Sequence, residues 1–329
     1  MNAVTPPPEP TPVVLPVRTI GPPTTISSEA QNALAVAART PATTYPPPSD
    51  LEGWRRAMEA SEAIWDPVAT QILAECRCRV ETQALAGVTT YLCTPAAANA
   101  AAKPIYLYFH GGGFVFGAGP FARAFGAKSA DELALETLSV DYRTPPAHPF
   151  PAALEDCFTV YRELAHGAPG RKIIIGGSSA GGNLAAALTL MIRDRDLPPP
   201  AAVVLLTPEV DLTEAGDSFR TNELLDVNLK AGLPECNALY AAGRALTDPY
   251  VSPLFADFTR GFPPTLIQTG TRDLFLSNSV LMHRKLRRAG IEAELHVWEA
   301  MPHGSFGFGT VPENAEISAE VRCFIARHC

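Results

Sequence analysis

Short apolar runs alternate with longer amphipathic stretches along most of this chain. The runs are expected to form eight strands, near residues 76–82, 87–93, 104–109, 137–141, 171–175, 201–206, 264–269 and 293–298. The stretches between them are expected to form helices, near residues 121–135, 151–166, 180–193, 274–289 and 313–327. Strands that are apolar throughout and alternate with helices are typical of a mostly parallel sheet covered on both faces. Since the first two strands follow each other with no helix between them, we expect an α/β fold with an antiparallel edge.

Two regions interrupt this alternation. The first 50 residues contain 12 prolines, which fix φ and remove backbone donors, so we expect a proline-rich extended arm (1–50) with one short helix near 28–39. A helix capped by Ser49 is predicted next (51–74), with an apolar face made of Leu51, Trp54, Met58, Ile64, Trp65, Val68 and Leu73. Within the remaining domain (75–329), a polar and mostly helical insertion is predicted at about 211–250. We expect this insertion and the N-terminal helix to form a cap over the sheet.

Composition and charge narrow the possible functions. With 329 residues, of which 47% are hydrophobic and 18% charged, the chain can bury a large core. A net charge of −8 and the lack of a basic stripe argue against a nucleic-acid partner. The seven cysteines include no C-x-x-C pair and no histidines show zinc-ligand spacing, so we expect no metal and a reducing compartment. Since neither a secretory pattern nor a long apolar run is visible, we expect a cytoplasmic protein with no membrane span.

The segment Gly177-Ser178-Ser179-Ala180-Gly181 fits the pattern G-x-S-x-G between a predicted strand and a predicted helix. A serine on so tight a turn adopts strained backbone angles, and the helix N-terminus favours negative charge beside it. Ser179 is therefore the candidate nucleophile. The alternatives are a glycine-rich connector or a phosphate-binding loop, although the lysine that such a loop requires is replaced by Asn183.

A serine hydroxyl needs a base, and the base needs an orienting acid. His303 follows the last predicted strand and Asp273 follows the strand before it, so both are expected at the sheet edge where Ser179 lies. Asp273 as a helix cap and His303 as a surface imidazole are the ordinary alternatives. Asp248 is a rival acid, but we interpret it as a turn residue beside Pro249. An unperturbed histidine pKa near 6.5 predicts that a reaction using His303 slows below about pH 6.

The segment HGGGFVFG (110–117) follows another predicted strand. Three glycines let backbone N–H groups converge on one point, as the oxyanion of acyl transfer requires. We assign the oxyanion hole to Gly112, Gly113 and Ala180, and expect His110 to hold the loop by side-chain hydrogen bonds. A flexible loop is the alternative for this segment taken alone. The residues expected to line an apolar substrate pocket are Phe114, Phe116, Leu206 and Tyr240, with core packing as the alternative for at least half of them. Ser178 is assigned to the same substrate pocket.

Together with three further segments, these motifs resemble the hormone-sensitive-lipase-like, or bacterial family IV, carboxylesterases of the α/β-hydrolase fold. The further segments are SVDYRTPPAHPFPAALED (139–156), LLTPEVDLT (205–213) and DPYVSPL (248–254). The resemblance covers about residues 75–329. It implies an eight-stranded sheet with helices on both faces, a helical cap, and hydrolysis of short- to medium-chain esters without a cofactor, and it is compatible with a homodimer. The chain departs from the usual family pattern in several places. Ser178 stands where an acidic residue is usual, and YRTPPA (142–147) replaces YRLAPE, so that Ala147 stands in place of the glutamate. Glu209 stands where an aromatic residue is common, and Ser305 stands where phenylalanine is common.

These features predict a serine carboxylesterase that forms an acyl-enzyme on Ser179 and acts on a small-molecule ester. A lactone hydrolase with the same triad is an alternative that the sequence does not separate. A non-catalytic small-molecule receptor is a second alternative, since the plant gibberellin receptors share this fold, but they lack the histidine that His303 represents here. A peptidase is a third, although the chain has no room for the propeller of the prolyl oligopeptidases.

Overall fold

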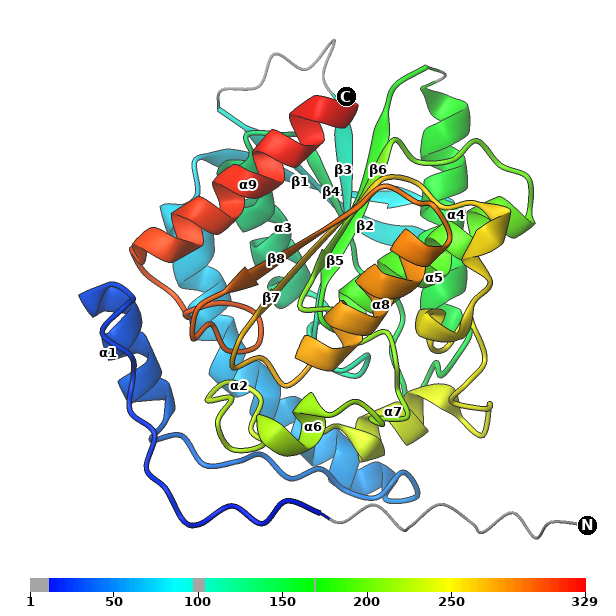
Figure 1. The fold of residues 1–329 in the computed structure, drawn as a ribbon. Coiled ribbons are helices and arrows are strands. Elements are labelled where there is room, and N and C mark those ends of the chain that lie inside the picture. Colours follow the sequence, from blue (N-terminus) through cyan, green and yellow to red (C-terminus); the bar gives the residue numbers. More distant parts are fainter. Residues whose placement is uncertain (1–11, 97–103, 169) are drawn as a thin grey trace, which may run out of the picture.

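An eight-stranded sheet forms the centre of the computed structural model, which describes residues 12–96, 104–168 and 170–329 (Figure 1). Its strands lie in the order β1-β2-β4-β3-β5-β6-β7-β8. Their bounds are β1 Cys78–Leu85, β2 Val88–Pro95, β3 Ile105–Phe109, β4 Thr137–Val140, β5 Ile173–Ser178, β6 Ala202–Leu206, β7 Thr265–Gly270 and β8 Ala293–Trp298. Strand β2 pairs antiparallel with both β1 and β4, whereas the six strands from β3 to β8 pair in parallel. The predicted α/β fold and its antiparallel edge are confirmed.

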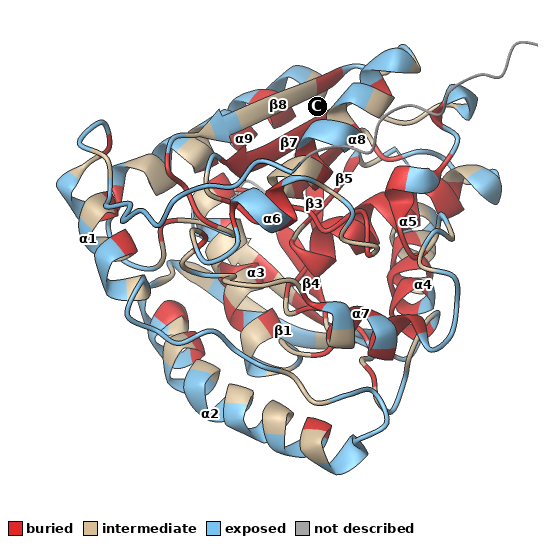
Figure 2. Cartoon of the chain, turned by 60° about the horizontal axis from the view of Figure 1, so that its bottom comes forward, coloured by how far each residue is buried: buried red, intermediate tan, exposed pale blue. Residues whose placement is uncertain are grey.

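Helices cover both faces of the sheet, which explains why the central strands are apolar throughout (Figure 1). On one face lie α3 (Pro120–Leu133) and α9 (Pro312–His328), packed on side chains such as Tyr106, Ile174 and Val204. On the other lie α4 (Ala152–Gly167), α5 (Ala180–Asp194) and α8 (Leu276–Arg288), packed on the alternate residues of the same strands. Helix α5 is buried along nearly its whole length (Figure 2).

Two helices precede the sheet, α1 (Ser28–Ala37) and α2 (Leu51–Glu75), and α2 packs against α3. The predicted cap of α2 is wrong by one residue, since the side chain of Asp50, not Ser49, accepts a hydrogen bond from Gly53 N at 2.8 Å. The predicted apolar face is also partly wrong. Trp54 is buried, but Leu51 and Ile64 are 61% and 66% exposed, because α2 rests on its neighbours along one narrow stripe only. Among the described residues, no helix is both long and apolar enough to cross a membrane.

The insertion at 211–250 is not mostly helical, contrary to prediction. It contains only α6 (Ser218–Thr221) and α7 (Pro234–Ala241), followed by the short 3-10 turns η1 (Pro253–Phe255) and η2 (Phe258–Arg260). The reason lies in its Asp, Asn and Ser side chains, which bond to nearby backbone groups in competition with helix formation. Asp226, for example, accepts hydrogen bonds from the backbone N–H groups of Asn228 and Leu229, both at 3.0 Å.

The insertion and the N-terminal helix meet in one apolar cluster. Trp54 of α2 belongs to the same cluster as Phe219, Leu233 and Leu239 of the insertion. The N-terminal part of α2 lies with α6 and α7 at one end of the sheet (Figure 1).

Candidate active site

Ser179 occupies the turn that joins β5 to α5. Its backbone has φ +58° and ψ −121°, a conformation that residues with side chains rarely adopt. The turn also packs tightly against β3, since a Cβ atom added to Gly181 would lie 2.0 Å from Phe109 O and one added to Gly177 would lie 2.4 Å from the backbone of Gly181. Only glycine fits at these two positions, which explains the spacing of the motif.

His303 and Asp273 form a hydrogen-bonded pair. Asp273 lies just after β7 and His303 just after β8, and His303 Nδ1 is 3.0 Å from Asp273 Oδ1. The Asp273 carboxylate is fully buried and also accepts hydrogen bonds from Phe275 N at 3.0 Å and Thr269 Oγ1 at 2.7 Å. Because a carboxylate accepts hydrogen bonds, Nδ1 carries the proton and Nε2 keeps its lone pair. This is the tautomer that a general base requires.

The end of β6 ties the serine turn to the histidine loop. Ser179 N donates to Leu206 O at 2.9 Å, and the hydroxyl of the next residue, Thr207, accepts a hydrogen bond from Gly304 N at 3.2 Å. The loops that carry Ser179, Asp273 and His303 therefore meet at the carboxyl edge of the parallel strands, which is where an open α/β sheet gathers its ligands.

The surroundings of His303 favour its charged form. Burial lowers the pKa of His303, but the hydrogen bond to Asp273 and the negative charges of Asp273 and Asp226 outweigh this and raise the pKa above its usual value. The pH below which His303 is protonated therefore lies higher than an unperturbed histidine would give.

The segment after β3 that contains Gly112 and Gly113 contacts the serine turn through Gly111. The segment after β3 folds tightly, since Gly112 O accepts hydrogen bonds from Val115 N at 3.1 Å and Phe116 N at 2.9 Å. It packs on the serine turn, because a Cβ atom added to Gly111 would lie 3.3 Å from Ser179 Cβ. Gly112 and Gly113 lie in a loop, and among the loop and turn hydrogen bonds of the described residues, none joins either of their N–H groups to a backbone carbonyl. Ala180 opens α5, so its N–H has no partner within the helix.

His110 contacts the loop that contains Gly112 and Gly113. Its Nδ1 is 2.8 Å from Gly111 O, and its ring stacks on Tyr142 with the ring centroids 4.0 Å apart. The Tyr142 hydroxyl donates to His110 O at 2.7 Å. Burial lowers the pKa of His110 to about 4, so the ring is neutral at neutral pH. These contacts fit a role in holding the loop.

The five predicted pocket residues divide into two groups. Phe114 and Tyr240 are fully buried and stack on each other with centroids 4.0 Å apart, so both belong to the core. Phe116, Leu206 and Ser178 are only partly buried. The ring of Phe116 lies 5.7 Å from that of Tyr45 and 6.3 Å from that of Trp54, so the region before β1 covers this part of the site.

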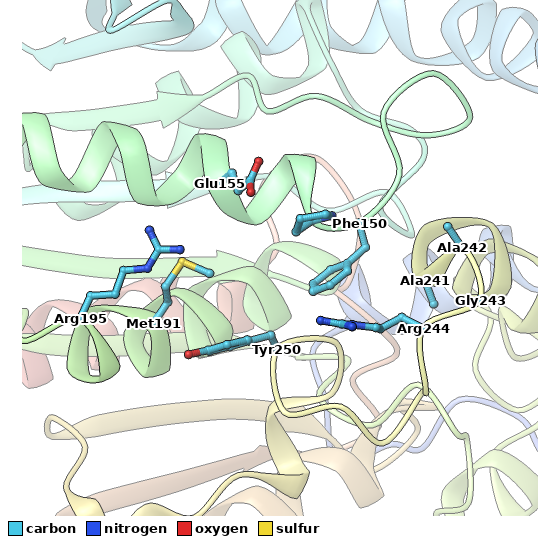
Figure 3. Close-up of a pocket in the computed structure, with 10 residues that line it drawn as sticks. Phe150, Glu155, Met191, Arg195, Ala241, Ala242, Gly243, Arg244 and Tyr250 are labelled. Atoms are coloured by element: carbon cyan, nitrogen blue, oxygen red, sulfur yellow. The ribbon is translucent and has the colours of Figure 1, made fainter.

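A surface cavity of about 560 Å³ lies apart from the candidate catalytic residues (Figure 3). It contains none of the candidate catalytic residues, and it is lined by Phe150, Pro151, Glu155, Met191, Arg195, Ala241, Ala242, Gly243, Arg244 and Tyr250. Its charged side chains are exposed and of both signs, and Arg244 already pairs with Asp248 at 3.1 Å. Asp248 also accepts a hydrogen bond from Tyr250 N at 2.9 Å, which is the contact of a turn residue.

Two buried carboxyl groups near the site were not predicted from the sequence to belong to it. Glu209 was noted only as a departure from the family. It is fully buried, neither of its oxygens makes a hydrogen bond of ordinary geometry with the described residues, and burial, followed by the charge of Glu214, raises its pKa well above the usual range. Asp226 was not noted at all. Nothing in its sequence context marks it, because its partners lie in distant loops.

Asp226 lies beside the acid and base pair. Ligand-type atoms of Asp226, Asp273 and His303 all lie within 4.8 Å of one another, a spacing that a metal ion accepts. Each oxygen of both carboxylates, however, already accepts a hydrogen bond from the protein. These hydrogen bonds fit a hydrogen-bonded network better than an open set of metal ligands.

The chain is similar to known proteins over most of its length. The sequence profile of a family described as alpha/beta hydrolase fold matches residues 106–307. An esterase of Acinetobacter venetianus is 32% identical over 207 residues, which are 62% of this chain and 68% of the relative. The crystal structure of an esterase, E25, superposes with a TM-score of 0.89 at 35% identity and covers 96% of this chain and 99% of that one. An esterase from the bacterial hormone-sensitive lipase family superposes with a TM-score of 0.78 at 29% identity, covering 92% and 98%.

Proposed function

Because this chain belongs to the hormone-sensitive-lipase-like carboxylic ester hydrolases of the α/β-hydrolase fold, we propose that Ser179 is its nucleophile and His303 its general base. Asp273 orients His303 and stabilises its cation. The observation that carries this proposal is the partly buried hydrogen bond of 3.0 Å between His303 Nδ1 and Asp273 Oδ1. The loop of His303 is in turn bonded through Thr207 to the strand end beside Ser179.

The reaction follows from these positions. His303 Nε2 takes the proton of Ser179 Oγ while Oγ attacks the ester carbonyl carbon, and the oxyanion that forms is met by the N–H groups of Gly112, Gly113 and Ala180. The imidazolium then gives its proton to the departing alcohol, which leaves an acyl-enzyme on Ser179. Water, deprotonated by His303, attacks this ester in the same way and releases the carboxylic acid. Removing one oxyanion donor typically costs about 10² to 10³ in rate.

The substrates we propose are small esters with short- to medium-chain acyl groups. The half-buried Phe116, with Tyr45 and Trp54 packed around it, supports a confined apolar site beside the oxyanion loop. A lactone would open by the same steps, with its alcohol still attached to the acyl group. We also propose that α2 and the 211–250 insertion form one cap, a proposal supported by the apolar cluster that Trp54 shares with Phe219 and Leu233.

Replacement of the nucleophile tests this function. Ser179→Ala is expected to lower kcat for p-nitrophenyl esters by at least about 10⁴-fold, as loss of a triad serine does elsewhere. The exposed Ser28→Ala serves as the matched control and should behave as the wild type. An organophosphate should label the wild type and the control on the peptide that contains Ser179. Equal rates for Ser179→Ala and wild type, or a label on another residue, would remove Ser179 as the nucleophile.

The acyl-chain preference has its own measurement. A p-nitrophenyl ester series from acetate to laurate should give its highest kcat/KM at the short or middle members. A rate that keeps rising to laurate would reject the proposed chain length without affecting the nucleophile.

A further inference from the structure

Three side chains of the insertion hold the two loops that carry the acid and the base. We call residues 271–275 the acid loop, since it contains Asp273, and residues 299–306 the base loop, since it contains His303. Asn222, Asp226 and Asn228 reach both loops from the segment 222–229, which lies between α6 and α7. Together they make six hydrogen bonds to backbone groups of the two loops.

Asp226 is the one of the three that joins the two loops through a single atom. Its Oδ2 accepts hydrogen bonds from Leu274 N at 2.8 Å and from His303 N at 3.0 Å. Its Oδ1 accepts from Asn228 N and Leu229 N, so the carboxylate is fixed by its own segment as well. Asp226 is fully buried, which makes it a rigid anchor and not a solvated surface group.

The two asparagines complete the arrangement with neutral donors. Asn222 Nδ2 donates to Asp273 O at 2.9 Å and to Thr271 O at 3.2 Å, both in the acid loop. Asn228 Nδ2 donates to His303 O and Ser305 O in the base loop, both at 2.9 Å. Both backbone polar groups of His303 are therefore held by the 222–229 segment, while its ring is held by Asp273.

We propose that Asp226 is a positioning residue of the reaction, which holds the acid loop and the base loop in register from within the insertion. The inference rests on the proposed function, because it assigns Asp226 a task only if Asp273 and His303 work as a pair. Asp226 contacts no substrate in the proposed reaction. It fixes the backbone on which the pair stands, so its loss should lower kcat more than it changes KM.

The charge of Asp226 gives the inference a second readout. The titratable groups acting on His303 are Asp273 and Asp226, and those acting on Asp226 are Asp273 and His303. Burial and the charge of Asp273 raise the pKa of Asp226 to about 6, so it is an anion in the slightly alkaline range, where it favours protonated His303. A neutral residue at this position should therefore shift the acid limb of the pH profile to lower pH.

Asp226→Asn in the full chain tests the proposal. Each oxygen of Asp226 accepts hydrogen bonds from two backbone N–H groups, four in all. The amide of asparagine has only one acceptor oxygen, so its NH₂ group must face two N–H donors whichever way the amide is turned, and two of the four hydrogen bonds are lost. We expect kcat for p-nitrophenyl butyrate to fall by about 10- to 100-fold with KM changed less than about threefold, and the acid limb of kcat/KM to move to lower pH. A kcat within twofold of wild type and an unmoved limb would overturn the proposal.

Asp211→Asn is the matched control. Asp211 is also a buried carboxylate of the insertion, and its Oδ1 accepts hydrogen bonds from Thr213 N and Thr213 Oγ1, neither of which belongs to the acid loop or the base loop. It should keep the wild-type pH profile and kcat. An equal effect in both variants would show a general need for buried carboxylates in the insertion and would overturn the specific role of Asp226.

A second variant covers the case in which Asp226→Asn does not fold. Asn228→Ala removes only the two exposed hydrogen bonds to the base loop. It should lower kcat by about three- to tenfold without moving the acid limb, since no charge is lost, and an unchanged kcat would then overturn the proposal. Ser179→Ala, run in parallel, separates the two levels. If it stays active, the proposed function fails, whereas if it is inactive and Asp226→Asn behaves as wild type, only the present inference fails.

Discussion

Replacement of Asp273 by asparagine examines the acid and base pair directly. In the proposed reaction, His303 becomes a cation 3.0 Å from the buried Asp273 carboxylate. At an effective dielectric constant of about 20, two unit charges at that distance attract each other by about 5.5 kcal/mol. At about 1.4 kcal/mol for each factor of ten in rate, this attraction corresponds to about 10⁴ in kcat.

The amide of Asp273→Asn can keep most of the geometry. Its oxygen can still accept from His303 Nδ1 and Phe275 N, while its NH₂ group can donate to Thr269 Oγ1, which accepts as well as donates. The loss should therefore come from the missing charge, and we expect kcat to fall by about 10³- to 10⁴-fold while the protein stays folded.

Asp248→Asn provides the comparison. The ion pair of Asp248 with Arg244 is partly exposed, and such pairs contribute about 0–1 kcal/mol, so kcat should change by less than about twofold. Both variants are assayed with p-nitrophenyl butyrate after circular dichroism and a thermal melt show that they are folded. If Asp248→Asn loses as much activity as Asp273→Asn, or loses more, the assignment of the acid is wrong.

Two further outcomes depend on the pKa shifts. The acid limb of the wild-type kcat/KM profile should lie above the value of about 6.5 for an ordinary histidine, because Asp273 and Asp226 raise the pKa of His303; a limb at pH 6 or lower, measured from pH 5 to 9, would contradict this. Burial and the charge of Glu214 raise the pKa of Glu209 in the folded protein. The protonated Glu209 therefore contributes fully to stability below its unfolded pKa of about 4.3. This contribution is lost as the pH rises from about 4.3 towards the folded pKa. Glu209→Gln should therefore gain free energy of unfolding relative to wild type between pH 5 and pH 8, by up to about 1.4 kcal/mol per pH unit in urea titrations, and a constant difference would show that Glu209 is not held protonated.

The sequence predicted the sheet and the positions of its functional turns for one physical reason. Ser179, Asp273 and His303 each follow a strand within a few residues, and strands that are buried on both faces are easy to identify. Their shared edge then follows from parallel pairing. The structure brings Asp273 and His303 into contact, while the catalytic roles of all three stay predictions.

The insertion was harder to predict because its conformation depends on distant partners. Its residues suggested helices, yet Ser218 bonds to the backbone of Leu274 and Ser277, and Asp226 to that of Leu274 and His303. Leu274 lies 48 residues after Asp226 in the chain, and His303 lies 77 residues after it. Local propensity contains no information on such contacts, so both the short helices and the position of Asp226 required the structure.

The site therefore combines two kinds of constraint. The turn at Ser179 is fixed by sterics within a few residues, because Gly177 and Gly181 leave no space for a Cβ atom. The acid and base loops are fixed instead by hydrogen bonds from the insertion, and a buried N–H without a partner costs about 1–3 kcal/mol. If this insertion were replaced by a different one, the new insertion would have to supply an acceptor for the N–H groups of Leu274 and His303. This requirement would hold for any substrate that the new insertion admits. The geometry of the acid and base pair thus depends on one short segment of the insertion, 222–229.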